Sequence, residues 1–196
     1  MSPQRSNRAN LLEGALRCLQ RLPPERVTAR AITEESGANL ASIAYHFGSK
    51  DELVTEAVIL GLDRWLEQVG DALADVAHED PATRYRRAGA ASEATRREHE
   101  GLARNFVSAL ARAQHEPRVR ELLAEGFRKT RADVAALLGL GSDEVGEDAA
   151  GLVHAQFTGL LLQTLLDPGL AIEGERMEAA QVRLLRVLPS QPRGRS

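Results

Sequence analysis

Apolar residues recur at intervals of three and four along most of the chain, which is the spacing of one face of an α-helix. The clearest run follows Pro117. Its apolar face consists of Val119, Leu122, Leu123, Phe127, Val134, Leu137 and Leu138. No segment has the strict alternation of apolar and polar residues that indicates a half-buried strand. β-branched residues are few and Ala and Leu are abundant, so composition also favours helix. The pattern predicts an all-α protein.

Residues that begin or end helices divide this pattern into about nine helices. The strongest of these signals are prolines and the glycines near 140 and 169. We expect helices over about 6–22, 28–35, 39–46, 49–76, 81–97, 102–113, 118–138, 142–166 and 174–188. The final residues 189–196 are polar and contain two prolines, so we expect a disordered tail there.

The segment from Thr28 to Lys50 has the features of two short helices joined by a tight turn. Thr28 is a favoured helix cap, and Gly37 suits the left-handed conformation in which many helices end. The third helix is shorter than two turns, so neighbouring helices must hold it in place. Two helices joined in this way are one means of placing a helix in the major groove of DNA.

The distribution of charge along the chain agrees with a protein that has one surface for binding nucleic acid. The chain has a net charge of −3, which gives no general attraction to DNA. Residues 1–50 carry seven Lys or Arg against four Asp or Glu, whereas residues 51–196 carry 18 against 24. We therefore expect a helix-turn-helix DNA-binding domain over residues 1–50 and a helical domain for effector binding and dimerisation over residues 51–188.

The same segment resembles a known family in several positions at once. A helix that starts at Thr28 and contains Ile32 is followed by Ser36-Gly37, then by Ser42-Ile43 and by Tyr45-His46-Phe47-Gly48-Ser49-Lys50 before an acidic helix start. This order resembles the tetracycline-repressor-like family of transcriptional regulators, over about residues 8–56. The rest of the chain agrees with that family in length and helix count. One departure is Ala44, where the family commonly has Tyr or Asn.

The candidate DNA contacts follow from the groups available in this segment. Lys50 lies at a helix N-terminus, where free backbone N–H groups already favour phosphate. Arg30 could reach a phosphate or a guanine edge, and Leu40 could pack on a thymine methyl group. Simpler roles remain open, such as helix capping by Thr28 or a solvated surface position for Arg30 and Lys50. The candidates are Thr28, Arg30, Asn39, Leu40, Ser42, Tyr45, His46 and Lys50.

The resemblance implies a homodimer that binds a double-stranded operator through two half-sites and uses the last two helices as its interface. Segment 149–166 lacks charged residues and is apolar on more than one face. It is long enough to reach the lower limit of a membrane span, but its five polar residues favour a helix buried on nearly all sides. The candidate interface residues are Leu152, Gly159, Leu160, Leu166, Leu184 and Leu188.

The middle helices are expected to enclose a small-molecule effector, again by resemblance to the family. The few polar residues there predict a largely apolar or amphipathic compound of unknown identity. Ordinary core packing is the competing interpretation for each aromatic residue. The candidate effector-binding residues are Trp65, Phe106, Phe127, Thr130 and Phe157.

Two other classes of function compete with a regulator. The five histidines are dispersed without metal-ligand spacing, and Cys18 has no evident base beside it, so we expect no enzyme, metal or cofactor. A helical small-molecule-binding or interaction protein that has lost specific DNA binding is the stronger alternative, because Ala44 offers a base only a methyl group. A single cysteine and the absence of an apolar leader favour the cytoplasm.

Overall fold

The computed structural model describes residues 3–187, and this part of the chain contains nine α-helices and three short 3₁₀ turns. The predicted all-α fold is confirmed for these residues. The predicted tail 189–196 and Leu188 lie outside the described residues. The helices are α1 (Pro3–Arg21), α2 (Ala29–Ser36), α3 (Ala41–Phe47), α4 (Lys50–Asp71), α5 (Pro81–Thr95), α6 (Glu100–Arg112), α7 (Pro117–Leu138), α8 (Glu144–Leu166) and α9 (Gly174–Leu185). The 3₁₀ turns are η1 (Pro24–Arg26), η2 (Ala74–Val76) and η3 (Pro168–Leu170).

Several predicted boundaries were wrong by a few residues, among them the following three. The first helix begins at Pro3 rather than near residue 6. The fourth ends at Asp71, and the chain then continues through η2 instead of the same helix. The eighth begins at Glu144 because Asp143, rather than Ser142, is its cap: the Asp143 carboxylate accepts a hydrogen bond of 2.9 Å from the N–H of Gly146.

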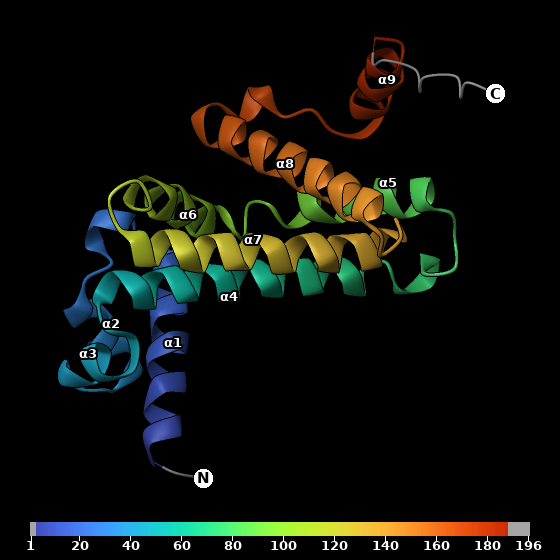
Figure 1. Cartoon of the computed structure of the whole chain (residues 1–196). Helices are drawn as coiled ribbons and strands as arrows, with labels where there is room; N and C mark the ends of the chain where they lie inside the picture. Colours follow the sequence, from blue (N-terminus) through green and yellow to red (C-terminus); the bar gives the residue numbers. More distant parts are fainter. Residues whose placement is uncertain (1–2, 188–196) are drawn as a thin grey trace.

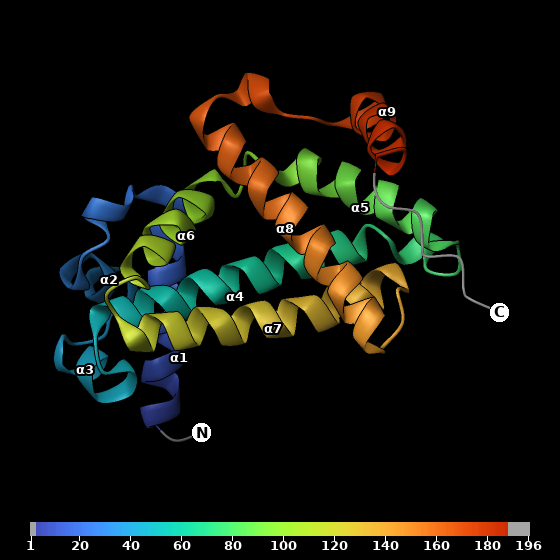
Figure 2. The same cartoon turned by 45° about the horizontal axis from the view of Figure 1, so that its top comes forward.

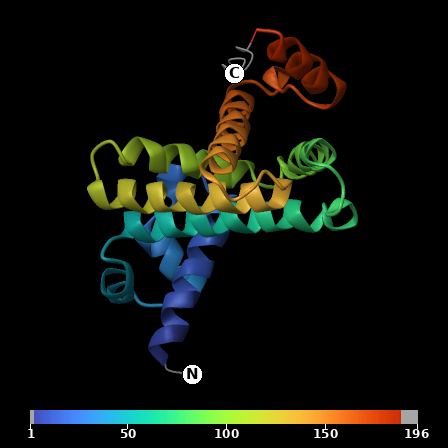
Figure 3. The same cartoon turned by 45° about the vertical axis from the view of Figure 1, so that its right-hand side comes forward.

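The long helices α4 and α7 lie side by side at the centre of the molecule (Figures 1 and 2). Helix α1 runs from α4 toward the end where α2 and α3 lie, and α8 crosses over the opposite side of the pair (Figure 3). An extended link after α8 leads to α9, which lies near α5 (Figure 2). The helix-turn-helix is therefore at one end of the molecule and the two C-terminal helices are at the other.

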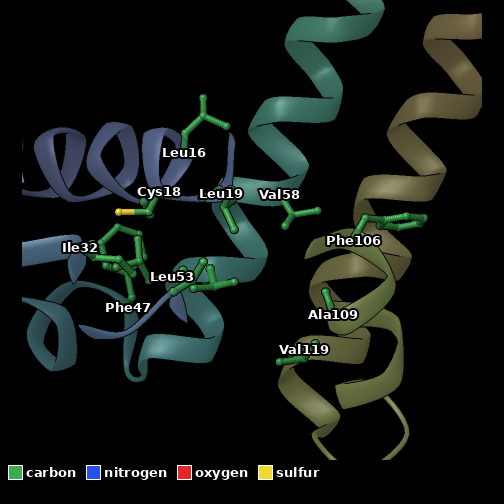
Figure 4. Packing of buried hydrophobic residues seen from close by; sticks show 14 of the residues in the cluster. Leu16, Cys18, Leu19, Ile32, Phe47, Leu53, Val58, Phe106, Ala109 and Val119 are labelled. Carbon is green, nitrogen blue, oxygen red and sulfur yellow. The ribbon is translucent and has the colours of Figure 1, made fainter. Parts of the chain in front are cut away.

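One continuous apolar core joins these two parts. It includes buried residues from α1 to α4 and continues into α6 and α7 without a break. Figure 4 shows its centre, with Leu19, Ile32 and Phe47 on the helix-turn-helix side and Phe106 and Val119 on the other. Ile32, Ile43 and Phe47 are each at most 4% exposed, so these three side chains hold the short α3 in place.

A polar contact lies inside this core, between the end of α1 and α6. The last carbonyl groups of a helix lack partners within that helix. Here the amide of buried Asn105 donates to the carbonyl of Leu19 at 3.1 Å and to that of Gly101 at 2.9 Å. Gly101 also brings α6 unusually close, because a Cβ there would lie 2.5 Å from the carbonyl oxygen of Gln20. The first helix is thus fixed directly to the body.

Helix α8 differs from its prediction as a helix buried on nearly all sides. Only Gly146, Ala150, Leu161 and Thr164 are buried in it. Among the described residues it is the one helix that is long and apolar enough to cross a membrane, a test that apolar helices of soluble proteins also pass. Much of its apolar surface is therefore uncovered in a single chain.

The close approach of α6 to α1 predicts a large effect for a single methyl group. Gly101→Ala is expected to destabilise the protein by about 1–3 kcal/mol, because the added Cβ meets rigid backbone oxygens of Leu19 and Gln20. Thermal and urea unfolding of the variant measure this loss.

Gly89 provides a matched control, since it lies within α5 and a Cβ there meets nothing within 4 Å. Gly89→Ala should stabilise the protein by roughly 0.5–1 kcal/mol through helix propensity alone. Equal effects of the two substitutions would contradict the close contact at Gly101.

Candidate functional site

The turn between α2 and α3 has the geometry predicted from its sequence. The Thr28 hydroxyl accepts a hydrogen bond from the N–H of Ala31 at 3.1 Å and caps α2. Gly37 has a φ of 68°, the left-handed conformation that favours glycine. Asn39 caps the next turn, since its side-chain oxygen accepts a hydrogen bond of 2.9 Å from the N–H of Ser42. The three-helix unit therefore presents α3 on its outer side.

Most of the predicted DNA contacts share that outer side. Leu40 is 60% exposed and Tyr45 is 71% exposed, and the ring of Tyr45 lies edge-on to His46. Arg30 is exposed on α2 and pairs with Glu34 one turn along the same helix. Thr28 and Asn39 are exposed as well, so their capping roles leave them accessible.

Ser42 corrects the prediction. It is 8% exposed, and its hydroxyl donates to the side-chain oxygen of Asn39 at 3.0 Å. This side chain serves the turn, so we no longer expect it to contact a base. Ala44 is exposed on α3 and Tyr45 follows it, which leaves the tyrosine as the large group on this surface.

Arg8 makes a contact with the end of α3 that the sequence did not predict. The guanidinium of Arg8 on α1 lies 4.7 Å from the centre of the Phe47 ring and pairs with Glu56 on α4. A cation over an aromatic face contributes about 0.5–1 kcal/mol at such a partly exposed site. Arg8 therefore links the ends of α1, α3 and α4.

The start of α4 is capped by Ser49. The Ser49 hydroxyl accepts a hydrogen bond of 3.1 Å from the N–H of Glu52. Lys50 is the first residue of the helix, and its ammonium lies 2.7 Å from Asp51. The free N–H groups and the positive end of the helix dipole at this point favour an anion such as phosphate.

The body encloses a cavity of about 600 Å³ between α4, α5, α7 and α8. All five residues predicted to bind an effector contribute to its wall: Trp65, Phe106, Phe127, Thr130 and Phe157. A cavity of this size suits a small organic molecule. Its wall is mostly aliphatic and aromatic, with few polar groups.

Contacts between rings organise this wall. Phe157 lies edge-on to Trp65 with ring centres 5.1 Å apart, and Phe127 lies edge-on to Phe106 at 6.0 Å. The indole N–H of Trp65 donates to the hydroxyl of Thr95 at 2.8 Å, which satisfies its polar atom. The ring of His99 stacks on the other side of Trp65 at 4.6 Å.

His154 is a cavity residue that the sequence pattern did not single out. It lies on α8, and its ring is edge-on to Phe127 at 5.0 Å. Burial lowers the pKa of His154, and the nearby positive charge of Arg131 lowers this pKa further. A neutral imidazole in an apolar wall can donate or accept one hydrogen bond. The feature of the sequence that could have identified His154 is its position as a polar residue inside the uncharged segment 149–166.

Helix α9 also contributes to the cavity, which its sequence did not reveal. Met177 and Gln181 form part of the wall. The amide of Gln181 donates to the hydroxyl of Tyr85 on α5, and the amide of Gln156 on α8 lies 3.3 Å from the sulfur of Met177. These contacts place α9 over one side of the cavity.

The predicted dimer residues fall into two groups. Leu152 is 74% exposed, Leu166 is 85% exposed, and a Cβ added at Gly159 would meet nothing within 4 Å. They share one face of α8 with the exposed Ala155, and exposed Leu184 lies on α9. Leu160 instead is half-buried and lines the cavity, so we remove it from the expected interface.

Comparison with known sequences identifies both halves of the chain. The model of the family described as bacterial regulatory proteins, tetR family, matches residues 11–57. The model described as the C-terminal part of a BetI-type transcriptional repressor matches residues 81–188. Comparison with curated proteins gives no match. Within residues 3–187, no three His, Cys, Asp or Glu side chains gather as a metal site requires.

Solved structures show the same fold over nearly the whole chain. The multidrug-binding protein EbrR, complexed with imidazole, is 23% identical, has a TM-score of 0.65, and the match covers 98% of this chain and 94% of that one. A transcriptional regulator from Pseudomonas aeruginosa PAO1 is 23% identical, with a TM-score of 0.63 and coverage of 95% and 90%. A regulator from Saccharomonospora viridis in complex with choline is 21% identical, with a TM-score of 0.55 and coverage of 92% and 96%.

The two partly buried histidines predict a pH dependence of stability. Burial lowers the pKa of both His99 and His154, so the folded protein resists protonation that the unfolded chain accepts below about pH 6.5. Their contribution to stability is complete above that pH and declines as pH falls below it. His154→Gln should therefore reduce the loss of melting temperature between about pH 7.5 and about pH 5.5.

His78→Gln is the matched control, because His78 is exposed on the chain between η2 and α5. This variant should follow the wild-type profile. A profile for His154→Gln that is as steep as that of the wild type would contradict the effect of burial.

Proposed function

This chain belongs to the tetR family of bacterial regulatory proteins, and from this premise we propose that it is a repressor released from its operator by a small molecule. Its DNA-binding regulatory function is that of the family. The repressor assignment is supported by the C-terminal match over residues 81–188. The observation that carries the effector is the cavity of about 600 Å³ whose wall includes every residue selected from the sequence for that role.

DNA is read by the exposed side of α3 and fixed in register by the start of α4. Leu40, Tyr45 and His46 are the candidates for base contact, and Asn39 and Arg30 are candidates beside them. Lys50 and Thr28 contact phosphate, because each stands at a helix N-terminus where an anion is favoured. Phosphate contacts supply most of the affinity and position the reading helix, while base contacts supply the specificity.

A homodimer places two such units on a palindromic operator. One three-helix unit makes few contacts, so specific affinity needs two half-sites. The exposed apolar face of α8, with Leu152, Gly159 and Leu166, forms the interface together with exposed Leu184 on α9. An apolar surface of this kind needs a partner to cover it.

The effector is a small, largely apolar or amphipathic compound. Apolar side chains dominate the cavity wall, and His154 and Gln156 supply hydrogen bonds at its α8 side. Two proteins of similar fold hold imidazole and choline in their structures, which supports a small organic ligand. We place the protein in the cytoplasm, where it would meet both this compound and DNA.

Release from DNA follows a shift between two dimer states. Trp65 lines the cavity from α4, and Lys50 begins that same helix. We assign residues 1–50 to DNA binding and residues 51–188 to effector binding, so α4 starts at the boundary between them. An effector that binds better to one tilt of α4 changes the spacing of the two reading helices.

Removal of the Lys50 ammonium tests the DNA contact. Lys50→Ala should weaken binding to DNA of every sequence and reduce the slope of log affinity against log salt by about 0.9 for each phosphate that the variant no longer neutralises. Titration of a duplex selected from a random pool, at several salt concentrations, measures both quantities. The selected duplexes should contain inverted repeats, as a dimer requires.

Lys129 is the other lysine of the chain and serves as control. It lies on α7 and pairs with Asp63 and Asp133, so Lys129→Ala should leave the salt slope unchanged. A wild-type protein that forms no salt-sensitive complex with any duplex would refute DNA binding.

Filling the cavity tests the effector. Thr130→Phe places a ring in the wall of the cavity, so a compound that releases the wild-type protein from DNA should bind at least tenfold more weakly, roughly the effect of an overpacked site. DNA affinity without the compound should stay the same. Screening small molecules for dissociation of the DNA complex, followed by titration of the variant, measures this effect.

Arg128→Phe introduces the same ring on α7 outside the cavity wall and should respond to the compound as the wild type does. If no compound among a broad panel alters DNA affinity, or if both variants respond alike, the cavity is not an effector site.

A further inference from the structure

One carboxylate at the start of α4 is shared by two cations from different helices. Oδ1 of Asp51 lies 2.7 Å from Nζ of Lys50, its neighbour in sequence. The same oxygen lies 3.6 Å from Nε of Arg112, the last residue of α6. The lysine is thus close to the carboxylate, whereas the arginine is slightly too far for a hydrogen bond.

The arginine has hydrogen-bonding capacity left over. Its Nη1 donates to the hydroxyl of Ser108 at 3.0 Å. Its Nε and Nη2 are buried and make no hydrogen bond among the described residues, and the same is true of Oδ1 of Asp51. Buried polar atoms without partners are rare and costly, so a small movement that joins them is favourable.

Lys50 has two competing anions once DNA is present. While it remains at 2.7 Å from Asp51, the carboxylate occupies one of its three N–H donors and offsets its charge, which weakens its attraction to a DNA phosphate. If it moves to phosphate, the buried Oδ1 of Asp51 loses its nearest cation, which is unfavourable because this side of the partly exposed carboxylate is closed to water. Arg112 is the cation that can replace it, by closing a gap of 3.6 Å to the length of a charged hydrogen bond, about 2.8 Å.

We propose that Arg112 is a positioning residue for DNA binding: it takes over Asp51 and thereby releases Lys50 to contact phosphate. This inference rests on the proposed function, specifically on the phosphate contact of Lys50. Arg112 itself touches no DNA in this scheme. It acts through the carboxylate that it shares with Lys50.

The same exchange connects the cavity to the DNA contact. Phe106 lines the cavity from α6, and Arg112 ends that helix. A compound that displaces α6 changes the distance between Arg112 and Asp51, and so changes how firmly Asp51 retains Lys50. A second ion pair, between Arg118 on α7 and Glu52, is longer at 3.7 Å, and Arg118 also pairs with Glu121. Arg112 is therefore the more direct link.

A double-mutant cycle between Arg112 and Asp51 tests the exchange. The four proteins are the wild type, Arg112→Ala, Asp51→Asn and the double variant, each titrated with duplex DNA of random sequence at several salt concentrations. Arg112→Ala should weaken binding roughly two- to fivefold, the range of a partly exposed ion pair, and should reduce the salt slope. In the Asp51→Asn background Lys50 is already free, so the same substitution should have no further effect.

Two further variants separate this role from a purely structural one. Arg112→Lys keeps a cation at the end of α6 and should retain most of the affinity. Arg104→Ala removes an exposed pair with Glu100 on the same helix and should have no effect. Melting temperatures, recorded for each protein, identify any decrease in affinity that comes from unfolding.

The possible failures are distinguishable. An equal decrease in affinity from Arg112→Ala in both backgrounds, or no decrease in either, overturns the exchange while the proposed function stands. If Lys50→Ala leaves duplex binding unchanged, both the phosphate contact and the exchange are refuted. If the wild type binds no duplex, the proposed function fails and the exchange fails with it.

Discussion

The amide of Asn105 closes the carbonyl end of α1 against α6, and the position of the DNA-binding unit relative to the body depends on this contact. It lies within an otherwise apolar core that runs from the helix-turn-helix to α7. An apolar core tolerates small sliding movements, whereas a buried amide with two carbonyl partners specifies one register. Together with the close approach at Gly101, it makes α1 part of the body as well as part of the DNA-binding unit.

Because the contact at Asn105 fixes α1 to the body, movements of α4 and α6 take place relative to α1. Both helices border the cavity, and the end of α6 lies beside the start of α4, but α1 holds the N-terminal half of α6 through Asn105 and the close approach at Gly101. At the C-terminal end of α6, Arg112 lies 3.6 Å from Asp51 on α4, and Arg120 on α7 donates a hydrogen bond of 3.0 Å to the carbonyl of Ala113.

Much of this fold could be predicted from the sequence because helix periodicity and helix caps are local signals. Thr28 and Gly37 stand where the sequence indicated. The differences arose where the direction of a side chain or a distant contact decides. The sequence makes Ser42 a candidate for base contact, but its hydroxyl turns inward to Asn39, three residues before it. Asn105 occupies a core position of α6, three residues after Leu102 and one before Phe106. A polar residue at such a position indicates a buried polar contact, which here is the contact between α6 and α1.

The contacts within a single chain cover helix α9 only in part. It covers one side of the cavity through Met177 and Gln181, yet none of its residues is buried. Leu184 and Leu185, three and four residues after Gln181, are exposed. A helix with so little burial gains most of its stability from tertiary packing, and in the dimer that we propose this packing comes from a partner that covers Leu184 and Leu185. In that dimer the partner determines how firmly α9 closes the cavity of one protomer, which couples effector affinity to dimer geometry without any contact between the effector and the second chain.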